Sequence, residues 1–231
     1  MERANGVTAG PALPAVPGLP PGAASDLVEE TFTLAGHDVR MVRPRDGDAL
    51  LDELLTEDDS DEDRLPFWAE LWPSGTALAG AICGRDLAGR RVVELGSGLG
   101  LVSVAAALAG ADVLATDRSP EAIAFTTVNA VRNGATVRTA VCAFDQPRPL
   151  LDGAPWDLVL AADVLYEQAN VPLLLWLLPR LVAPAGEALI ADPDRRPAGL
   201  LLAGLDAAGW RRDRLAADPP AVSIHRLRPP A

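Results

Sequence analysis

From Arg91 onward, short apolar runs rich in β-branched residues alternate with longer segments of helical periodicity. The short runs predict strands at residues 92–95, 112–116, 136–141, 158–162 and 188–191. The longer segments predict helices at residues 99–108, 120–133, 171–182 and 197–208. Strands and helices that alternate at this spacing favour an α/β fold with a mostly parallel sheet and right-handed crossovers.

The two ends of this pattern differ from its middle. Residues 210–215 and 222–227 have strand patterns with no helix between them, which predicts an antiparallel C-terminal strand pair. Near the N-terminus, apolar and polar positions alternate from residue 30 to 42 around a turn at Gly36, as in a β-hairpin. We also expect short helices at residues 46–55 and 76–83.

The composition fits one globular domain. The chain has 231 residues, of which 49% are hydrophobic and 23% are charged. Residues 1–25 are rich in Ala, Pro and Gly and offer little to bury, so we expect a disordered tail there and a single domain over residues 26–231. The start has no continuous apolar run, and residues 171–182 are too short and too interrupted to cross a bilayer. We therefore expect a soluble, cytoplasmic protein.

Charge narrows the classes of partner. The formal net charge is −12, and all 20 basic residues are arginine. A net negative charge repels the phosphate backbone and therefore disfavours general binding to nucleic acid. Six of the seven residues at 57–63 are acidic, and they predict either a solvated loop or an acidic lip that attracts a cationic substrate. Two cysteines and two histidines are too few for a structural zinc site, so we expect no metal, and they fit a reducing compartment.

Three glycines at alternate positions, Gly96, Gly98 and Gly100, lie between an apolar strand and an apolar helix. This arrangement predicts a tight loop that approaches a ligand beside the N-terminus of the helix. Asp117 ends the next strand, where a ribose ligand is expected. A dinucleotide is one candidate ligand, although the third glycine comes one position early for that pattern. Glu94, two residues before the first glycine, instead favours a cationic ligand.

The segment from Glu94 to Gly100 resembles motif I of the class I (seven-strand) methyltransferases that depend on S-adenosyl-L-methionine (SAM). The resemblance implies a Rossmann-like, doubly wound seven-strand sheet. It also implies that the loop contacts the methionine part of SAM, that Asp117 bonds the ribose, and that Asp145 lies near the adenine amine. The full set of cofactor-binding residues expected from it is Trp72, Glu94, Gly96, Ser97, Gly98, Gly100, Asp117, Asp145, Gln146 and Ala162. At Gln146 many relatives carry a tryptophan instead.

Three further segments indicate one family within the class I methyltransferases. Residues 66–75, 129–134 and 161–167 together are similar to methyltransferase family 16, which includes the lysine methyltransferase of the electron-transfer flavoprotein β subunit. The similarity covers roughly residues 30–195. It implies a SAM-dependent N-methyltransferase that modifies a lysine side chain of a protein. The chain contains no Asn-Pro-Pro-Tyr or Asp-Pro-Pro-Tyr segment, which disfavours methylation of adenine, cytosine or a glutamine amide.

Asp163 and Tyr166 are the expected catalytic residues. Asp163 follows the fourth strand, and ligands of open α/β sheets bind at the carboxyl ends of the strands. The resemblance places the methyl acceptor here, so we expect Asp163 to orient the acceptor nitrogen and Tyr166 to pack or hydrogen-bond against it. The alternative for Asp163 is a helix N-cap. Glu70 is either a surface acid or a second contact to the acceptor.

Several other residues have structural interpretations. Trp68, Trp156, Trp176 and Trp210 are expected to pack in the interior. Asn133 and Gly134 are expected to end a helix. The two histidines, His37 and His225, lie in predicted strands with no partner that suggests a catalytic triad.

The residues leave other functions open. The acceptor could be a small amine or pyridine, as in a nicotinamide-like N-methyltransferase. The protein could also be a SAM-binding regulator without turnover, or an NAD-dependent oxidoreductase. For the lysine methyltransferase we expect a basic protein substrate, a monomeric enzyme, and no nucleic-acid or membrane partner.

Overall fold

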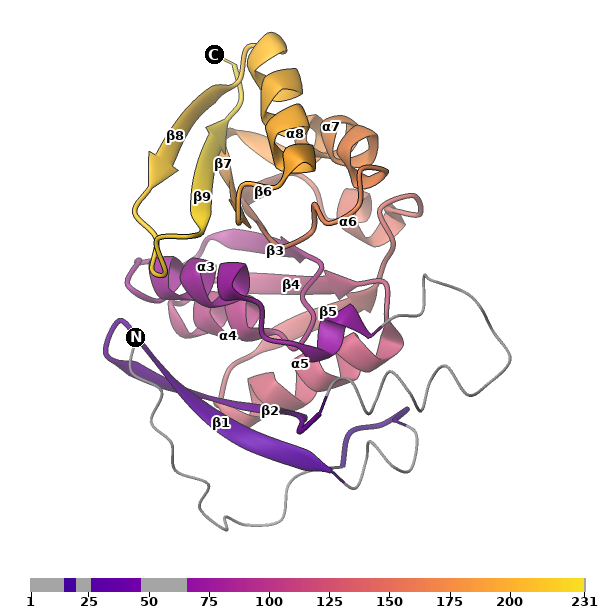
Figure 1. Ribbon diagram of the computed structural model, residues 1–231, viewed down its shortest axis with the longest axis vertical. Helices are drawn as coiled ribbons and strands as arrows, with labels where there is room; N and C mark the ends of the chain where they lie inside the picture. Colours follow the sequence, from indigo (N-terminus) through magenta and orange to yellow (C-terminus); the bar gives the residue numbers. More distant parts are fainter. Residues whose placement is uncertain (1–14, 20–25, 47–65, 231) are drawn as a thin grey trace.

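The computed structural model describes residues 15–19, 26–46 and 66–230. Its centre is a seven-stranded mixed sheet with the strand order β5-β4-β3-β6-β7-β9-β8 (Figure 1). The strands are β3 (Arg91–Leu95), β4 (Asp112–Asp117), β5 (Val137–Val141), β6 (Trp156–Ala162), β7 (Val182–Asp192), β8 (Arg211–Leu215) and β9 (Ser223–Arg228). The five strands from β5 to β7 are parallel, and β9 runs antiparallel to both β7 and β8. The predicted sheet and its antiparallel pair are therefore confirmed.

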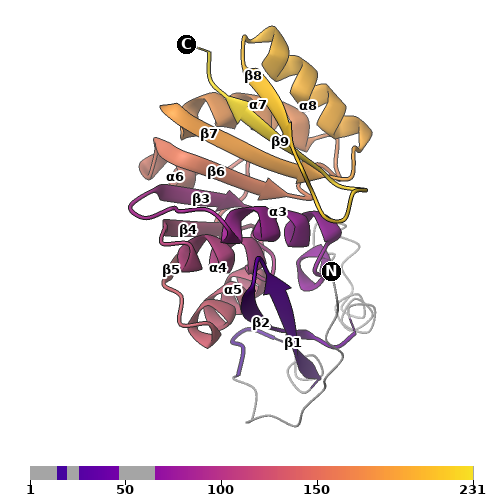
Figure 2. The ribbon, with the colours of Figure 1, turned by 90° about the vertical axis from the view of Figure 1, so that its left-hand side faces the viewer.

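Helices cover both faces of the sheet (Figure 2). Buried residues of one face come from α3 (Pro73–Cys83), α4 (Leu101–Leu108) and α5 (Pro120–Arg132). Buried residues of the other face come from α6 (Arg148–Asp152), α7 (Asn170–Leu181) and α8 (Arg196–Ala207). Among the described residues, no helix combines the length and the apolar character needed to cross a bilayer.

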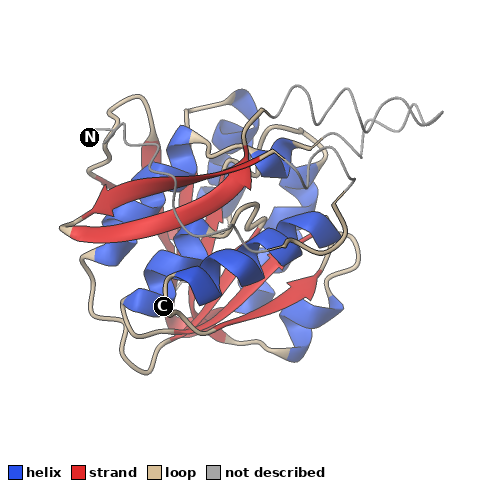
Figure 3. Cartoon of the chain, turned by 90° about the horizontal axis from the view of Figure 1, so that it is seen from below, coloured by secondary structure: helices blue, strands red, loops and turns tan. Residues whose placement is uncertain are grey.

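The N-terminal hairpin is confirmed and is longer than predicted. Strands β1 (Leu27–Leu34) and β2 (His37–Pro44) pair antiparallel around Gly36, which has a φ of +85°. They form a separate two-stranded sheet that lies across the helices on one side of the main sheet (Figure 3). The predicted helix at 46–55, apart from its first residue, and the acidic run at 57–63 lie outside the described residues.

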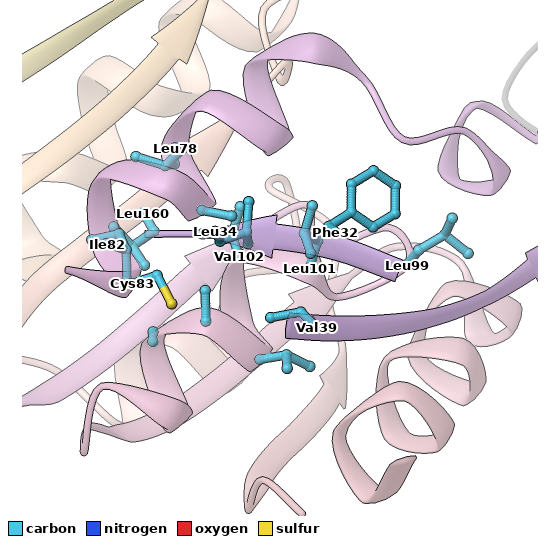
Figure 4. Packing of buried hydrophobic residues seen from close by; sticks show 14 of the residues in the cluster. Phe32, Leu34, Val39, Leu78, Ile82, Cys83, Leu99, Leu101, Val102 and Leu160 are labelled. Atoms are coloured by element: carbon cyan, nitrogen blue, oxygen red, sulfur yellow. The ribbon is translucent and has the colours of Figure 1, made fainter. Parts of the chain in front are cut away.

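Apolar side chains of the hairpin complete the core on the side of α3 and α4. Phe32, Leu34 and Val39 belong to one buried cluster with Leu78 of α3 and Val102 of α4 (Figure 4). Burial of this apolar surface holds the hairpin on the domain.

The same cluster includes Val16, which is only 6% exposed and belongs to the segment for which we expected disorder.

Two side-chain amides of α5 fasten the hairpin further. Asn129 accepts a hydrogen bond from the Val42 amide at 2.7 Å and donates to the Val42 carbonyl at 3.1 Å and to the Leu99 carbonyl at 2.9 Å. Asn133 in the same way accepts from the amide of Arg40 at 2.9 Å and donates to its carbonyl at 2.7 Å. Asn133 is also the C-cap of α5, as predicted. The amides thus pair with β2 much as another strand would.

Two structural interpretations of single residues are wrong. Trp176 is 46% exposed on α7, where the guanidinium of Arg180 stacks 4.0 Å from its ring centre, whereas Trp156 and Trp210 are buried as predicted. Asp163 is not a helix N-cap, because α7 begins at Asn170 and its N-cap is Ala169. Trp176 lies in an apolar run that hid the solvent-facing side of α7, and Asp163 lies seven residues before the first residue of that helix.

Candidate functional site

A cavity of about 880 Å³ lies at the carboxyl ends of the central parallel strands. Its walls come from the glycine loop after β3, the ends of β4 and β6, the loop after β5 and the segment before α3. A cavity of this size suits a ligand of several hundred daltons. Of the twelve residues expected to bind cofactor or catalyse, eleven line it: Trp72, Glu94, Gly96, Ser97, Gly98, Asp117, Asp145, Gln146, Ala162, Asp163 and Tyr166.

Gly100 is the exception. It has a φ of +86°, is the N-cap of α4, and does not line the cavity. A Cβ atom at this position would lie 2.8 Å from Oγ1 of Thr126 on α5. The third glycine therefore allows α4 and α5 to approach each other.

Glu94 is the last but one residue of β3 and carries a buried carboxyl group. Ser103 of α4 donates a hydrogen bond to its Oε2. Burial raises the pKa of Glu94 from its ordinary value of 4.5 to about 8, an effect that the bond from Ser103 opposes. A cationic group beside this carboxyl would stabilise its charged form.

Asp117 is held in place by the backbone. Its Oδ2 accepts a hydrogen bond from the Gly98 amide at 2.8 Å, and its Oδ1 accepts one from the Ser119 amide at 3.0 Å. Burial raises the pKa of Asp117, and these two bonds oppose the rise. The carboxyl thus connects the end of β4 with the glycine loop and still lines the cavity.

The loop after β5 forms another wall of the cavity. Asp145 and Gln146, in the loop after β5, are both exposed and lie beside Phe144 and Cys142 in the lining. This wall offers a flat apolar side chain together with polar groups, a combination that suits a planar heterocycle.

Aromatic side chains gather near Asp163. The ring centres of Phe67 and Tyr166 lie 5.4 Å apart, and Tyr166 is 40% exposed. Trp72 is 39% exposed and donates a hydrogen bond from Nε1 to the Phe67 carbonyl at 2.9 Å. Trp68 is half-buried: its ring centre lies 5.4 Å from that of Phe125 in the core, and it also lines the cavity, so its predicted interior position is confirmed only in part. Glu70 is exposed and lines the cavity, so both of its interpretations stay open.

Asp163 is buried and has a φ of +57°, an uncommon backbone conformation that aspartate tolerates better than most residues. Its Oδ1 accepts a hydrogen bond in an ion pair with the guanidinium of Arg195. Asp192, at the end of β7, accepts from the backbone amide of Arg195 at 2.6 Å and from its Nη1 at 3.3 Å.

Arg195 was not among the functional residues predicted from the sequence. This residue lies 32 positions after Asp163, in the loop after β7, and it lines the cavity. One sequence feature could have identified Arg195: it follows the end of a predicted strand. Residues at the carboxyl ends of neighbouring parallel strands meet at one edge of the sheet.

His225 has a nearby carboxylate that the sequence did not suggest. Its Nε2 lies 3.7 Å from Oδ1 of Asp194, and burial lowers the pKa of the imidazole. Ser223 donates to the other oxygen of Asp194 at 2.7 Å, so its hydroxyl bonds the carboxylate rather than the imidazole. This order of groups does not form a nucleophile and base pair.

Comparisons with known proteins agree with this geometry. Residues 64–199 match the family model described as lysine methyltransferase. The chain is 34% identical over 157 residues to protein N-lysine methyltransferase METTL21A of Danio rerio, with 65% of this chain and 64% of the relative covered. It is 36% identical over 135 residues to the electron transfer flavoprotein beta subunit lysine methyltransferase of the same species, covering 56% and 51%. The chain thus spans less than two thirds of each relative.

Solved structures show the same fold at low identity. One is the Thermus thermophilus 16S rRNA N2 G1207 methyltransferase in complex with AdoMet and guanosine, with a TM-score of 0.60, 16% identity, and coverage of 88% of this chain and 50% of that chain. Another is a ribosomal protein L11 methylase from Lactobacillus delbrueckii, with a TM-score of 0.53, 22% identity, and coverage of 67% and 78%.

Proposed function

The chain belongs to the lysine methyltransferase family, and on that premise we propose that it transfers a methyl group from SAM to the side-chain nitrogen of a lysine in another protein. The observation that carries the proposal is the arrangement along one cavity of two buried acids on the glycine loop side and of Asp163 with Tyr166 beside them.

The residues present fit SAM. When bound, SAM supplies a methyl group on a positively charged sulfur, together with an ammonium, a ribose and an adenine. Glu94 is a buried carboxyl group whose pKa is raised by burial. A cationic ligand beside it would stabilise the charged carboxylate and so lower this pKa. Asp117 would face the ribose, and Asp145 with Gln146 would face the adenine. Gly96, Ser97, Gly98, Trp72 and Ala162 would form the remaining walls.

Tyr166 and Asp163 would receive the acceptor. A lysine nitrogen can attack a methyl carbon only with its lone pair free, so the site must bind the amine, orient it and exclude water. The carboxylate of Asp163 can accept a hydrogen bond from the amine and so direct its lone pair. Tyr166 and Phe67 offer apolar surface for the methylene groups of the side chain.

We further propose a basic protein acceptor and a monomeric enzyme that acts in the cytosol without a nucleic-acid or membrane partner. The net charge of −12 supports the first part, because it would attract a basic protein and repel nucleic acid. The buried free cysteines, Cys83 and Cys142, are compatible with a reducing compartment. Light scattering of the purified protein measures the oligomeric state, and cell fractionation measures the location.

Labelled SAM tests the proposed reaction directly. The purified chain is incubated with labelled SAM and host lysate, and the modified residue is identified by mass spectrometry. We expect a labelled protein band with methyl groups on lysine. Label only in small molecules would favour the small-amine alternative. SAM binding without any transfer would favour a regulator, and tight NAD binding without SAM binding would overturn the proposal.

Asp163→Ala tests the acceptor side. We expect labelling to fall by about 100-fold, while the SAM affinity measured by calorimetry stays within about twofold. The matched control is Asp112→Ala, which removes an exposed carboxylate at the opposite, amino end of the parallel strands. Unchanged labelling by Asp163→Ala would remove this residue from the proposed site.

A further inference from the structure

The guanidinium of Arg195 lies between two carboxylates at the edge of the cavity. Its Nη1 bonds Asp163 and also lies 3.3 Å from Oδ2 of Asp192. Asp192 is completely buried, and its other oxygen holds the Arg195 backbone amide at 2.6 Å. Arg195 is therefore fixed by Asp192 through both its backbone and its side chain.

The backbone fixes Asp163 in the same place. Its amide donates to the Ala191 carbonyl at the end of β7 at 3.0 Å, which holds the residue in its left-handed conformation. The ion pair thus joins the loop after β6 to the loop after β7. Both side chains line the cavity, so a ligand near Asp163 is also near the guanidinium.

The net negative charge around Asp163 that could attract an incoming cation is small. Two carboxylates and one guanidinium sum to a single negative charge, whereas Asp163 and Asp192 alone would carry two. The other titratable groups on the walls near Asp163 are Glu70 before α3, Glu94 at the end of β3, and Tyr166 and Glu167 after β6. Arg195 is the cation that the structure places in contact with Asp163.

The ion pair of Asp163 and Arg195 affects whether the acceptor amine is protonated. A lysine side chain is an ammonium ion in neutral water, and a carboxylate without a counter-charge would hold it in that form. A nearby cation acts in the opposite direction and favours the neutral amine. The pair can therefore hold a hydrogen-bond acceptor toward the amine without binding the protonated form tightly.

We propose that Arg195 is a positioning residue that acts through Asp163 and lowers the pKa of the bound acceptor amine. The inference rests on the proposed function. The ammonium first gives its proton to solvent. The lone pair of the amine then forms the nitrogen–carbon bond as the carbon–sulfur bond of SAM breaks, and the electrons of that bond stay on sulfur. The methylated nitrogen carries the positive charge that the sulfur loses.

Arg195→Met tests the inference through the pH profile of labelling. We expect the pH midpoint for label incorporation into the protein band, at saturating SAM, to move up by about 1 pH unit. At neutral pH the rate would fall by about tenfold. Arg195→Lys, which keeps a cation, should restore most of the midpoint. The matched control, Arg138→Met, breaks an ion pair with Asp112 at the far end of the strands and should leave the midpoint in place.

A second measurement needs no turnover. NMR titration with Nα-acetyl-lysine amide, in the absence of SAM, measures how firmly the site holds an ammonium. Arg195→Met should bind this probe about threefold more tightly at neutral pH. If Arg195→Met does not fold, as judged by thermal unfolding, Arg195→Gln takes its place in both measurements.

The outcomes separate the two proposals. If the unmodified chain labels no protein, the proposed function falls and this inference falls with it. If the chain labels protein but the midpoint and the probe affinity do not change in Arg195→Met, this inference alone is overturned. A higher midpoint with rescue by lysine supports it, because a purely structural role for Arg195 would lower the melting temperature without moving the midpoint.

Discussion

Glu94 is the residue in which burial and charge oppose each other most clearly. Its pKa of about 8, against an ordinary value of 4.5, means that the folded protein binds its proton more tightly than the unfolded chain does. The contribution of this group to the free energy of unfolding is therefore complete below pH 4.5 and is lost as the pH rises through about 8. At neutral pH and above, binding of a cation beside Glu94 would stabilise the folded protein.

Glu94→Gln should separate stability from binding. The amide keeps the shape of the side chain and cannot ionise, so we expect the free energy of unfolding at pH 8.5 to rise by about 2 kcal/mol and to lose its decline between about pH 5 and pH 8. The affinity for SAM should fall by about tenfold. Urea unfolding across this pH range and calorimetry with SAM measure the two effects. A variant that binds SAM as the unmodified chain does would exclude contact between Glu94 and a cationic ligand.

At this scale the sequence predicts local groups better than distant ones. Glu94, Gly98 and Asp117 were found because a strand, a loop and a following strand place them within one short segment. Arg195 was not found, because its role depends on where the chain returns after β7. Ser103 was not found either, although it lies only nine residues after Glu94, because its hydrogen bond depends on which side of α4 faces β3.

At the scale of elements, α5 joins two parts of the molecule. Asn129 is completely buried, and its one amide group satisfies both backbone groups of Val42 in the hairpin and the carbonyl of Leu99 in the glycine loop. Movement of the hairpin is thereby coupled to movement of the loop.

Asn129→Leu should be costly for this reason. It leaves three buried backbone groups without partners, and we expect the free energy of unfolding to fall by about 3 kcal/mol. Asn133→Leu is the matched control: water can replace its bonds to the exposed backbone of Arg40, so the cost should be about 1 kcal/mol. Urea unfolding compares them. Equal losses in the two variants would contradict the assigned role of Asn129.

The sequence predicted most elements but not all of their lengths. The periodicity located α5, β4 and β6 within one or two residues. It missed α6, which has only five residues, and it shortened β7, whose strand of 11 residues begins immediately after α7. A run of five residues is too short for a helical period to appear. Pro184 and Gly186 in the first half of β7 are typical of a turn, so the sequence pattern placed the start of this strand at residue 188.

For the whole molecule, the net charge of −12 predicts how a substrate approaches. If the acceptor is basic, attraction over several ångströms raises the rate of encounter, and salt screens it. We expect the labelling rate at low acceptor concentration to fall by about fivefold between about 0.05 M and about 0.3 M salt. Neutralising the acids at 57–63 should reduce both the rate and its salt dependence. A rate that responds to neither change would exclude steering by charge.

The hairpin also defines where the molecule can be divided. The segment that matches the family begins at residue 64, whereas the hairpin of β1 and β2 ends before it, at residue 44. Val39, Met41 and Val42 of β2 are completely buried against the helices. A fragment trimmed to the family boundary would expose the apolar side of α3 and α4 and would be prone to aggregate. The segment that matches the family therefore lacks strands whose side chains complete the core.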